Sequence, residues 1–568
     1  MAELLHTAKF VVKVDGSALA PGVAALLESA YVDDSLQLPD LFQLTFLDQA
    51  RSVIEDGRFR IGSVVDISVF SGVDTGGERL VTGEVTALEA ELDDSGTTTI
   101  IRGYDTSHRL FRGRRTETYA NATYSDVARK VAQRAGLDVG KVDSSSTVYD
   151  LVSQANATDW QFLTELAREI GYEVGCLDGK FQFCKPSPSS QGPSKGTLTS
   201  TDPLQLVAGA NLISVRATVS STGQVKQVEV RGWDPVQKKE LVATAQAATV
   251  SATLDTKPAD TASPFGDAEH IGVSTPFSTQ SEVEAAAKAV AEQIASAYAE
   301  IEGVATGNSK LRAGTAVSLN RLKKPFDGKY VLTTTHHRFD PRNGYTVRFT
   351  AGGRQDRSLF GLTSPSASTN GSGPSPFGGV VTGLVTDVND PDDMGRVKVK
   401  FPWLSGSYNS DWARTVQVGA GDKRGAVMLP EVDDEVLVAF DRGDADHPIV
   451  VGSLYNGVDL PELGDGLIDG ATGAVKRRGF VSKDGHKLVF LDDASKSGVL
   501  LATAKNALRI SLNDTKSSIR ITSKGKVEVE GDEITVTAKK KLTLKASTGI
   551  TIDGGPSVEV KGSVIKLN

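Results

Sequence analysis

The chain has 568 residues, and at about 150 residues per domain this length predicts three or four domains. The 62 lysine and arginine residues against 71 aspartate and glutamate residues give a net charge of −9. This balance leaves no dominant basic surface for nucleic acid. The hydrophobic fraction of 39% and the charged fraction of 23% are those of a globular protein, not a disordered one.

Two features bear on where the chain is made. No run approaches the roughly 18 apolar residues of a membrane-spanning helix. The N-terminal residues 1–6 lack the basic region and apolar core of a secretory signal. We therefore expect the chain to be synthesised and folded in the cytoplasm.

The first 362 residues mix strand patterns with a few helices. β-branched and aromatic residues predict strands at residues 10–14, 42–46 and 64–70. The same reasoning places His336 and His337 in one strand, where adjacent side chains face opposite sides and do not share a metal. We therefore expect both histidines to be structural.

Helix N-terminal signals occur at three places. Thr123 is predicted to begin one helix and Thr158 a second, the latter with a capping box. A third helix is predicted over residues 281–300, with Glu284 completing its capping box and alanine filling most of its length. Because alanine buries little surface, this helix is predicted to be exposed or packed on a flat surface.

The only two cysteines, Cys176 and Cys184, flank Asp178-Gly179, a strong two-residue hairpin signal. In that register Cys176 pairs with Phe181 and Cys184 with Glu173, so the thiols do not face each other. We expect neither a disulfide nor a zinc site, which needs more ligands than two thiols.

Composition and strand spacing divide the chain into five segments. Residues 1–362 are predicted to form an α+β region with β-barrel domains, and the Ser-, Pro- and Gly-rich residues 363–379 a linker. Closely spaced short strands predict an OB-fold barrel over residues 380–456. Residues 457–479 are predicted to be a connector and residues 480–568 a β-helical spike, so the fold class is mainly β with some α.

The end of the chain carries alternating apolar pairs whose first members are separated by 7, 8, 8, 8 and 7 residues. The pairs are Val527/Val529, Ile534/Val536, Leu542/Leu544, Ile550/Ile552, Val558/Val560 and Ile565/Leu567. A fixed period predicts short stacked strands with one apolar edge turned inward. Two inward residues per repeat bury little surface, and a lone short strand leaves two unpaired edges.

An intertwined homotrimer would pair those edges and bury the first five pairs in one shared core. We therefore predict a trimer, with a single-chain solenoid and an ordinary small β-domain as the alternatives. The cluster Lys539-Lys540-Lys541 lies in this region. It is predicted to be a solvated turn protected from edge pairing by lysine, with weak surface attraction as a lesser hypothesis.

Four segments in order resemble the OB domain of VgrG spike proteins from type VI secretion, phage tails and phage-like contractile injection particles. They are Gly-Arg-Val-Lys-Val-Lys-Phe-Pro-Trp at 395–403, Trp-Ala-Arg-Thr-Val at 412–416, and the stretches 429–438 and 443–456. Residues 157–163 and 328–340 are similar to the hub portion of the same family, more weakly. The resemblance covers nearly the whole chain.

The resemblance implies a homotrimeric structural hub that caps the inner tube protein among baseplate proteins. It also implies a spike that contacts and pierces the target membrane when the sheath contracts, inside a particle that acts after firing or lysis. A PAAR-type tip protein and effector cargo are implied partners. The predicted docking residues for the tip are Val564, Ile565, Lys566, Leu567 and Asn568.

No catalytic residue, cofactor or metal is predicted. Between Asn456 and Gly479 there is no room for the lysozyme domain that the phage T4 spike carries at this place. The acidic turn 441–447 lacks the spacing of a calcium loop. The alternatives are a tail-associated hydrolase of cell wall or polysaccharide, and an adhesin that uses Arg442-Gly443-Asp444.

Overall fold

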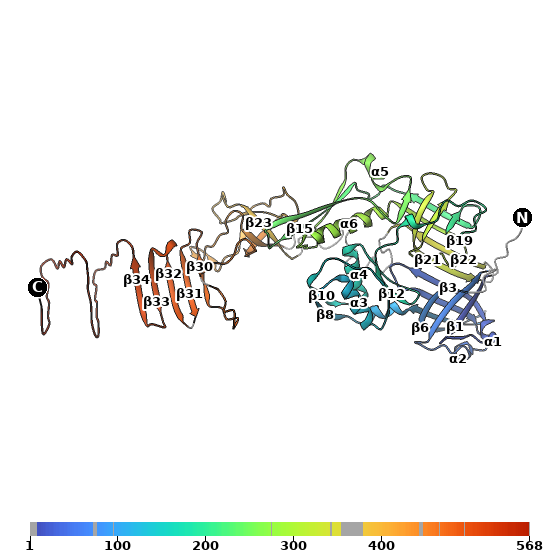
Figure 1. Ribbon diagram of the computed structural model, residues 1–568, viewed down its shortest axis with the longest axis horizontal. Helices are drawn as coiled ribbons and strands as arrows, with labels where there is room; N and C mark the ends of the chain where they lie inside the picture. The colour runs from blue at the N-terminus through green and yellow to red at the C-terminus, as the bar shows by residue number, and fades with distance from the viewer. Residues whose placement is uncertain are drawn as a thin grey trace. The chain divides into compact units, whose positions relative to one another are not determined.

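The computed structural model describes residues 8–71, 77–94, 96–273, 275–340, 344–353, 379–441, 447–464, 466–493 and 495–566. The chain forms two compact units, Met1–Leu460 and Pro461–Asn568 (Figure 1). Strands predominate over helices in the chain as a whole, and in the second unit they lie between residues 477 and 523, so the predicted class, mainly β with some α, is confirmed. Residues 363–378 of the predicted linker, and residues 442–446 of the acidic turn, lie outside the described part of the chain.

A 14-stranded sheet dominates the first unit. Its strands are β1 (Ala8–Val14), β2 (Ser17–Ala18), β3 (Leu27–Ser35), β4 (Leu41–Leu47), β5 (Val64–Ser71), β6 (Glu78–Asp93), β7 (Gly96–Asp105), β13 (Gln205–Val207), β14 (Leu212–Val219), β17 (Ala252–Leu254), β19 (Ala299–Thr306), β20 (Ala316–Asn320), β21 (Gly328–Asp340) and β22 (Gly344–Ala351). The main path runs β14-β19-β22-β21-β3-β4-β7-β6-β5-β1-β2. The antiparallel pair β21 and β3 therefore joins an early half of the sheet to a late half.

Alternation along the strands places one face of this sheet in the core. In β4, for example, Phe42, Leu44 and Phe46 are completely buried, whereas Gln43 and Thr45 between them are not. Two short helices, α1 (Pro21–Ala24) and α2 (Val53–Asp56), lie between the early strands. The strands predicted at 10–14, 42–46 and 64–70 are confirmed as β1, β4 and β5.

A smaller α/β part follows β7 and has its own apolar core. It contains β8 (Arg115–Ala122), α3 (Tyr124–Arg134), β9 (Asp138–Val142), β10 (Tyr149–Ala157), α4 (Asp159–Ile170), β11 (Glu173–Leu177) and β12 (Lys180–Cys184). Thr123 and Thr158 are the N-caps of the two helices, and each completes a capping box. Both predicted helix starts are therefore confirmed. In the β11–β12 hairpin, Cys176 pairs with Phe181 and Glu173 with Cys184, as predicted, and no disulfide joins the thiols.

Helix α6 (Gln280–Ser296) packs on the sheet of β15 (Gln227–Asp234), β16 (Lys239–Gln246) and β18 (Glu269–Gly272). The short α5 (Pro258–Ala262) precedes β18 in the chain. The buried residues of α6 include Ala286, Ala287 and Ala291, so the predicted packing on a flat surface is confirmed. Of the described helices, none is long and apolar enough to cross a membrane.

The predicted bounds of α6 were wrong at both ends. The N-cap is Thr279, and Glu282 completes the box in place of Glu284. The Glu282 carboxylate accepts hydrogen bonds from the backbone N–H groups of Ser278 and Thr279, at 2.9 and 3.0 Å. Two capping boxes overlap in this sequence, and the helix uses the earlier one. The helix ends at Ser296 because Tyr298, only 1% exposed, and the strand after it enter the core of the large sheet.

The OB-fold barrel predicted after the linker is confirmed. Its strands are β23 (Val380–Asp387), β24 (Lys398–Lys400), β25 (Arg414–Thr415), β28 (Glu435–Phe440) and β29 (Pro448–Ser453), with a small hairpin of β26 (Ala420–Gly421) and β27 (Arg424–Gly425). The sheet order is β24-β23-β28-β29-β25. Two backbone hydrogen bonds between Val397 and Ala413, at 3.0 and 2.8 Å, bring its outer strands together and close the barrel.

A buried ion cluster links the two halves of the large sheet. The Arg312 guanidinium, between β19 and β20, forms ion pairs with the carboxylates of Asp34 and Asp40, the latter at 3.6 Å. Asp34 also accepts a hydrogen bond from the backbone N–H of Ala313 at 3.1 Å. Burial, with the nearby carboxylates of Asp34 and Asp105, raises the pKa of Asp40 well above its usual range.

His336 and His337 face opposite sides of β21, as predicted. His336 contacts the Asp33 carboxylate, and its side chain is about one-third exposed. His337 is completely buried; its Nε2 donates to the carbonyl oxygen of Leu311 at 2.9 Å, and its Nδ1 accepts from the Tyr345 hydroxyl at 2.8 Å. Both ring nitrogens are used and burial lowers the pKa of His337 to about 4, so the imidazole is neutral at pH 7.

This neutral histidine predicts a loss of stability in mild acid. In the unfolded chain this histidine has a pKa of about 6.5 and takes up a proton as the pH falls below that value, whereas the folded protein resists protonation. This difference lowers the free energy of unfolding by about 2 kcal/mol between pH 7 and pH 5. His337→Gln removes this part of the pH dependence, as measured by urea unfolding at the two pH values. The raised pKa of Asp40 acts in the opposite direction, and because both proteins carry it, its effect cancels. His336→Gln is the control, and equal flattening by that variant contradicts the assignment.

Candidate functional site

The second unit begins with an antiparallel sheet whose five strands follow one another in sequence (Figure 1). The strands are β30 (Arg477–Val481), β31 (Lys487–Asp493), β32 (Lys496–Ala502), β33 (Leu508–Asn513) and β34 (Ser518–Ser523). Their register is regular across all four pairings. Residues that stand opposite each other therefore form straight rows, and all members of a row point to the same face.

Two neighbouring rows give this sheet an apolar face. One row is Phe480, Leu488, Leu501, Ile510 and Ile521, and the next row on the same face is Arg478, Phe490, Val499, Leu512 and Ile519. Nine of these ten side chains are apolar. We call these nine residues the apolar face.

Within the described residues no second layer of structure covers the apolar face. Ile519 is 72% exposed and Ile521 is 63% exposed, although both lie inside a regular strand. Phe480 and Leu501 are also more than half exposed. Monomeric proteins rarely leave so many neighbouring apolar side chains in water, so an exposed face of this kind marks an interaction surface.

The ten residues predicted as the core of the spike follow directly after this sheet, and the single chain buries none of them. They are Val527, Val529, Ile534, Val536, Leu542, Leu544, Ile550, Ile552, Val558 and Val560. The leading residue of each pair is 52–59% exposed and the second is 66–74% exposed; Val529, at 74%, is the most exposed of the ten.

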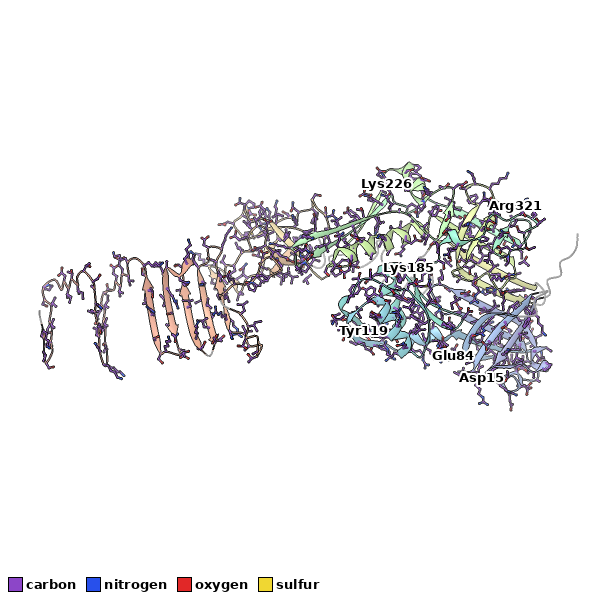
Figure 2. All side chains as sticks on the ribbon, in the orientation of Figure 1. Asp15, Glu84, Tyr119, Lys185, Lys226 and Arg321 are labelled. Atoms are coloured by element: carbon purple, nitrogen blue, oxygen red, sulfur yellow. The ribbon has the colours of Figure 1, made fainter. Side chains whose placement is uncertain are left out.

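These exposures exclude a core formed by one chain alone in this arrangement. From residue 524 to 566 the described backbone forms no strand, and the side chains stand off a single trace (Figure 2). No facing layer of the same chain therefore lies against Val529 or the other nine residues within the described part. The single chain leaves all ten side chains exposed, and the trimer core stays a prediction.

The two ends of the repeat region have similar local shapes, whereas the glycines between them differ. The leading residues of the pairs have nearly the same exposed fraction, and so do the second residues. The surroundings of two glycines, Gly531 and Gly562, are also alike. A Cβ atom at Gly531 would lie 3.6 Å from the carbonyl oxygen of Glu533, and one at Gly562 would lie 3.5 Å from that of Val564. In both places the next nearest atom is Cγ1 of an isoleucine, at 3.7 Å for Ile534 and 3.8 Å for Ile565. The turns at the two ends of the repeat region therefore match, as a fixed spacing predicts. Between them, a Cβ atom at Gly549 would meet nothing within 4 Å, and one at Gly554 would lie 2.3 Å from the carbonyl oxygen of Ser557.

At the end of the chain, Val564 is 72% exposed and Ile565 is 53% exposed. Lys566 is the last described residue, so Leu567 and Asn568 lie outside the described part. The tip-docking residues stay a prediction. Sequence reasoning missed the apolar face of β30 to β34, although alternation such as Leu508, Ile510 and Leu512 was available as a signal.

A buried carboxylate connects the OB-fold barrel to strand β15 within the first unit. Glu435, only 3% exposed, accepts a hydrogen bond from Trp233 Nε1 at 2.8 Å and one from Asn456 Nδ2 at 3.0 Å. The backbone N–H of Gly457 donates to the carbonyl oxygen of Pro235 at 2.9 Å. The barrel is therefore attached to the hub by specific polar contacts in addition to the chain itself.

The comparison with protein families decides the family. The family described as the Alg8 N-terminal domain matches residues 10–340, which are more than half of the chain. The chain belongs to the Alg8 N-terminal domain family. In this Alg8-type chain, residues 381–455 also match the type VI secretion system/phage-baseplate injector OB domain.

The Alg8-type chain is similar to curated proteins over shorter stretches. The actin cross-linking toxin VgrG1 of Vibrio cholerae serotype O1 is 32% identical over 161 residues, which are 28% of this chain and 14% of the toxin. The type VI secretion system spike protein VgrG3 of the same serotype is 36% identical over 120 residues, 20% of this chain and 12% of that protein. The expected resemblance to VgrG proteins is therefore confirmed. The matched stretches span far less than two thirds of the length of either relative.

Among solved structures, the 43 kDa tail protein of prophage MuSo2 from Shewanella oneidensis has a TM-score of 0.46 and 16% identity to the Alg8-type chain. The similarity covers 61% of this chain and 98% of the tail protein.

The buried carboxylate predicts a coupled pair of substitutions. Trp233→Phe removes a donor from Glu435, and we expect a loss of about 1–3 kcal/mol in the free energy of unfolding, because a buried charge is left with fewer hydrogen bonds. Adding Glu435→Gln to Trp233→Phe costs less than the sum of the two single changes. Urea unfolding followed by circular dichroism measures all three variants. Trp412→Phe, in the barrel but away from this contact, is the control, and strict additivity contradicts the pairing.

Proposed function

We propose that three copies of this chain form the hub and spike of a contractile injection system. The observation that carries the proposal is the apolar face of β30 to β34. It is uncovered in a single chain, continues into apolar repeats of fixed period, and follows an OB domain of the baseplate-injector type. The exposed apolar side chains of this chain therefore gather in the segment after the OB domain, which is the segment that the resemblance assigns to the spike.

The repeats favour three intertwined chains. Each repeat offers two inward side chains, and each short strand has two edges whose backbone groups need partners. Winding three chains about one axis supplies a neighbour to every edge and collects the pairs in one core. The first five pairs, from Val527 and Val529 to Val558 and Val560, would form that core. The apolar face of the preceding sheet would extend it.

The roles of the other parts follow from the same assignment. The hub, residues 1–362, would cap the inner tube protein at the baseplate. The spike would pierce the target envelope when the sheath contracts, with residues 564–568 as the platform for a PAAR-type tip or an effector. This work needs stiffness and no reaction centre, so we propose a structural, non-enzymatic role. Assembly would take place in the cytoplasm, and delivery on firing or lysis.

The first test is the mass of the purified full chain in solution. One chain has a mass of 60.0 kDa, so light scattering should give three times this value. The expected trimer persists at nanomolar concentration, because the intertwined strands cannot separate without unfolding. A stable species of one chain mass contradicts the proposal and favours a single-chain solenoid.

The second test compares neighbours in one repeat. Val536→Asp would bury three carboxylates close together at the axis, so we expect no trimer. Thr535→Asp places the same charge one residue earlier, on the opposite side of the strand, and should leave assembly intact. Ile552→Asp and Thr551→Asp form a second matched pair. Light scattering and size-exclusion chromatography measure all four variants. Equal behaviour within a pair shows that the predicted inward side chains do not face the core.

A further inference from the structure

A band of unpaired positive charge lies in the middle of the repeat region. Lys539, Lys540, Lys541 and Lys545 fall within seven residues, and all four are exposed. From residue 534 to residue 552 the chain contains these four lysines and no acidic residue. The band therefore carries a charge of +4 in a chain whose net charge is −9. We call these four residues the basic band.

Other lysines of the same region are neutralised by neighbours. Lys526 contacts the Glu528 carboxylate, and Lys561 contacts the Glu559 carboxylate. Among the residues that the structure describes, no carboxylate lies within ion-pair distance of the basic band. The charge of the band is therefore available to a partner outside the chain.

The repeat pattern also indicates which way two lysines of the band face. Leu542 and Leu544 are the inward pair of this repeat in the proposed spike, so Lys541 and Lys545 point outward with Thr543 between them. The outward surface of the repeat is cationic and hydroxyl-bearing and carries no large apolar side chain. Such a surface suits contact with phosphate groups at the face of a bilayer and does not suit insertion into its interior.

We propose that the basic band is a contact surface for the anionic headgroups of a lipid bilayer. This inference rests on the proposed spike, in which three copies would bring twelve lysines to one level of the shaft. Clustered lysines near an anionic membrane surface each add to its attraction, and the attraction falls off within a Debye length. The band would hold the shaft against the target membrane once the tip has reached it.

The test is flotation of the full chain with vesicles. Phosphatidylcholine vesicles with about one third phosphatidylglycerol should bind the protein, and pure phosphatidylcholine vesicles should not. Replacing the four lysines of the basic band by glutamine should reduce the bound fraction about tenfold or more. Raising the ionic strength from about 0.1 M to about 1 M should release the wild-type protein.

The matched control removes the same charge elsewhere in the second unit. Lys496, Lys505, Lys516 and Lys524 are all exposed, and their replacement by glutamine should leave vesicle binding within about twofold of wild type, because distant charges are screened. Equal loss in both variants overturns the inference in favour of a net-charge effect. Binding of duplex DNA in place of vesicles, lost in the basic-band variant, also overturns it.

Light scattering of each protein separates this inference from the proposed function. A trimer that ignores anionic vesicles overturns the role of the basic band and leaves the spike standing. A wild-type protein that is not trimeric overturns the spike itself, whatever its lipid binding.

Discussion

Within its described residues, the second unit carries a large apolar surface that no other part of that unit covers. Four regular strand pairings line up nine apolar side chains on one face of the C-terminal sheet, and the repeats that follow extend the same pattern. Hydrophobic burial is the main favourable contribution to folding, and in the proposed spike these residues would obtain it from other chains. The folding of the second unit and its assembly are therefore one process in the proposed spike.

The first unit is built on the opposite plan. Its large sheet, its smaller α/β part, the α6 layer and the OB barrel each have a separate buried core. Polar groups then tie these cores together: Arg312 bridges the sheet halves, and Glu435 connects Trp233 to the barrel. Buried polar contacts require particular geometry, because each unsatisfied group is costly. Such contacts therefore favour one arrangement of these cores over others.

Local structure was largely predictable from the sequence, and long-range pairing was not. A capping box or a two-residue hairpin depends on residues within a few positions of each other, so a single segment contains the whole signal. Examples are the capping boxes at Thr123 and Thr158 and the Asp178-Gly179 hairpin. The start of α6 failed because two capping boxes overlap, and only the packing of Tyr298 and the next strand decides where the helix ends. The pairing of β3 with β21 joins residues about 300 positions apart, and alternation within either strand says nothing about its partner. The period of the repeat region can be read from the sequence itself, but the described backbone from residue 524 to 566 forms no strand, so the stacked strands expected there stay a prediction. The apolar face before it requires knowledge of the register of five strands.

In the proposed spike, the repeated spacing of the apolar pairs would make the length of the shaft adjustable in steps. Insertion or deletion of eight residues adds or removes one layer and leaves the contacts of every other layer unchanged. The spacing itself varies between seven and eight residues along the region, and the apolar alternation within each pair is kept in both cases, so the turns between the pairs take up the difference. Homologous spikes can therefore differ in reach by whole repeats, and the turns at Gly531 and Gly562 are natural places for such changes.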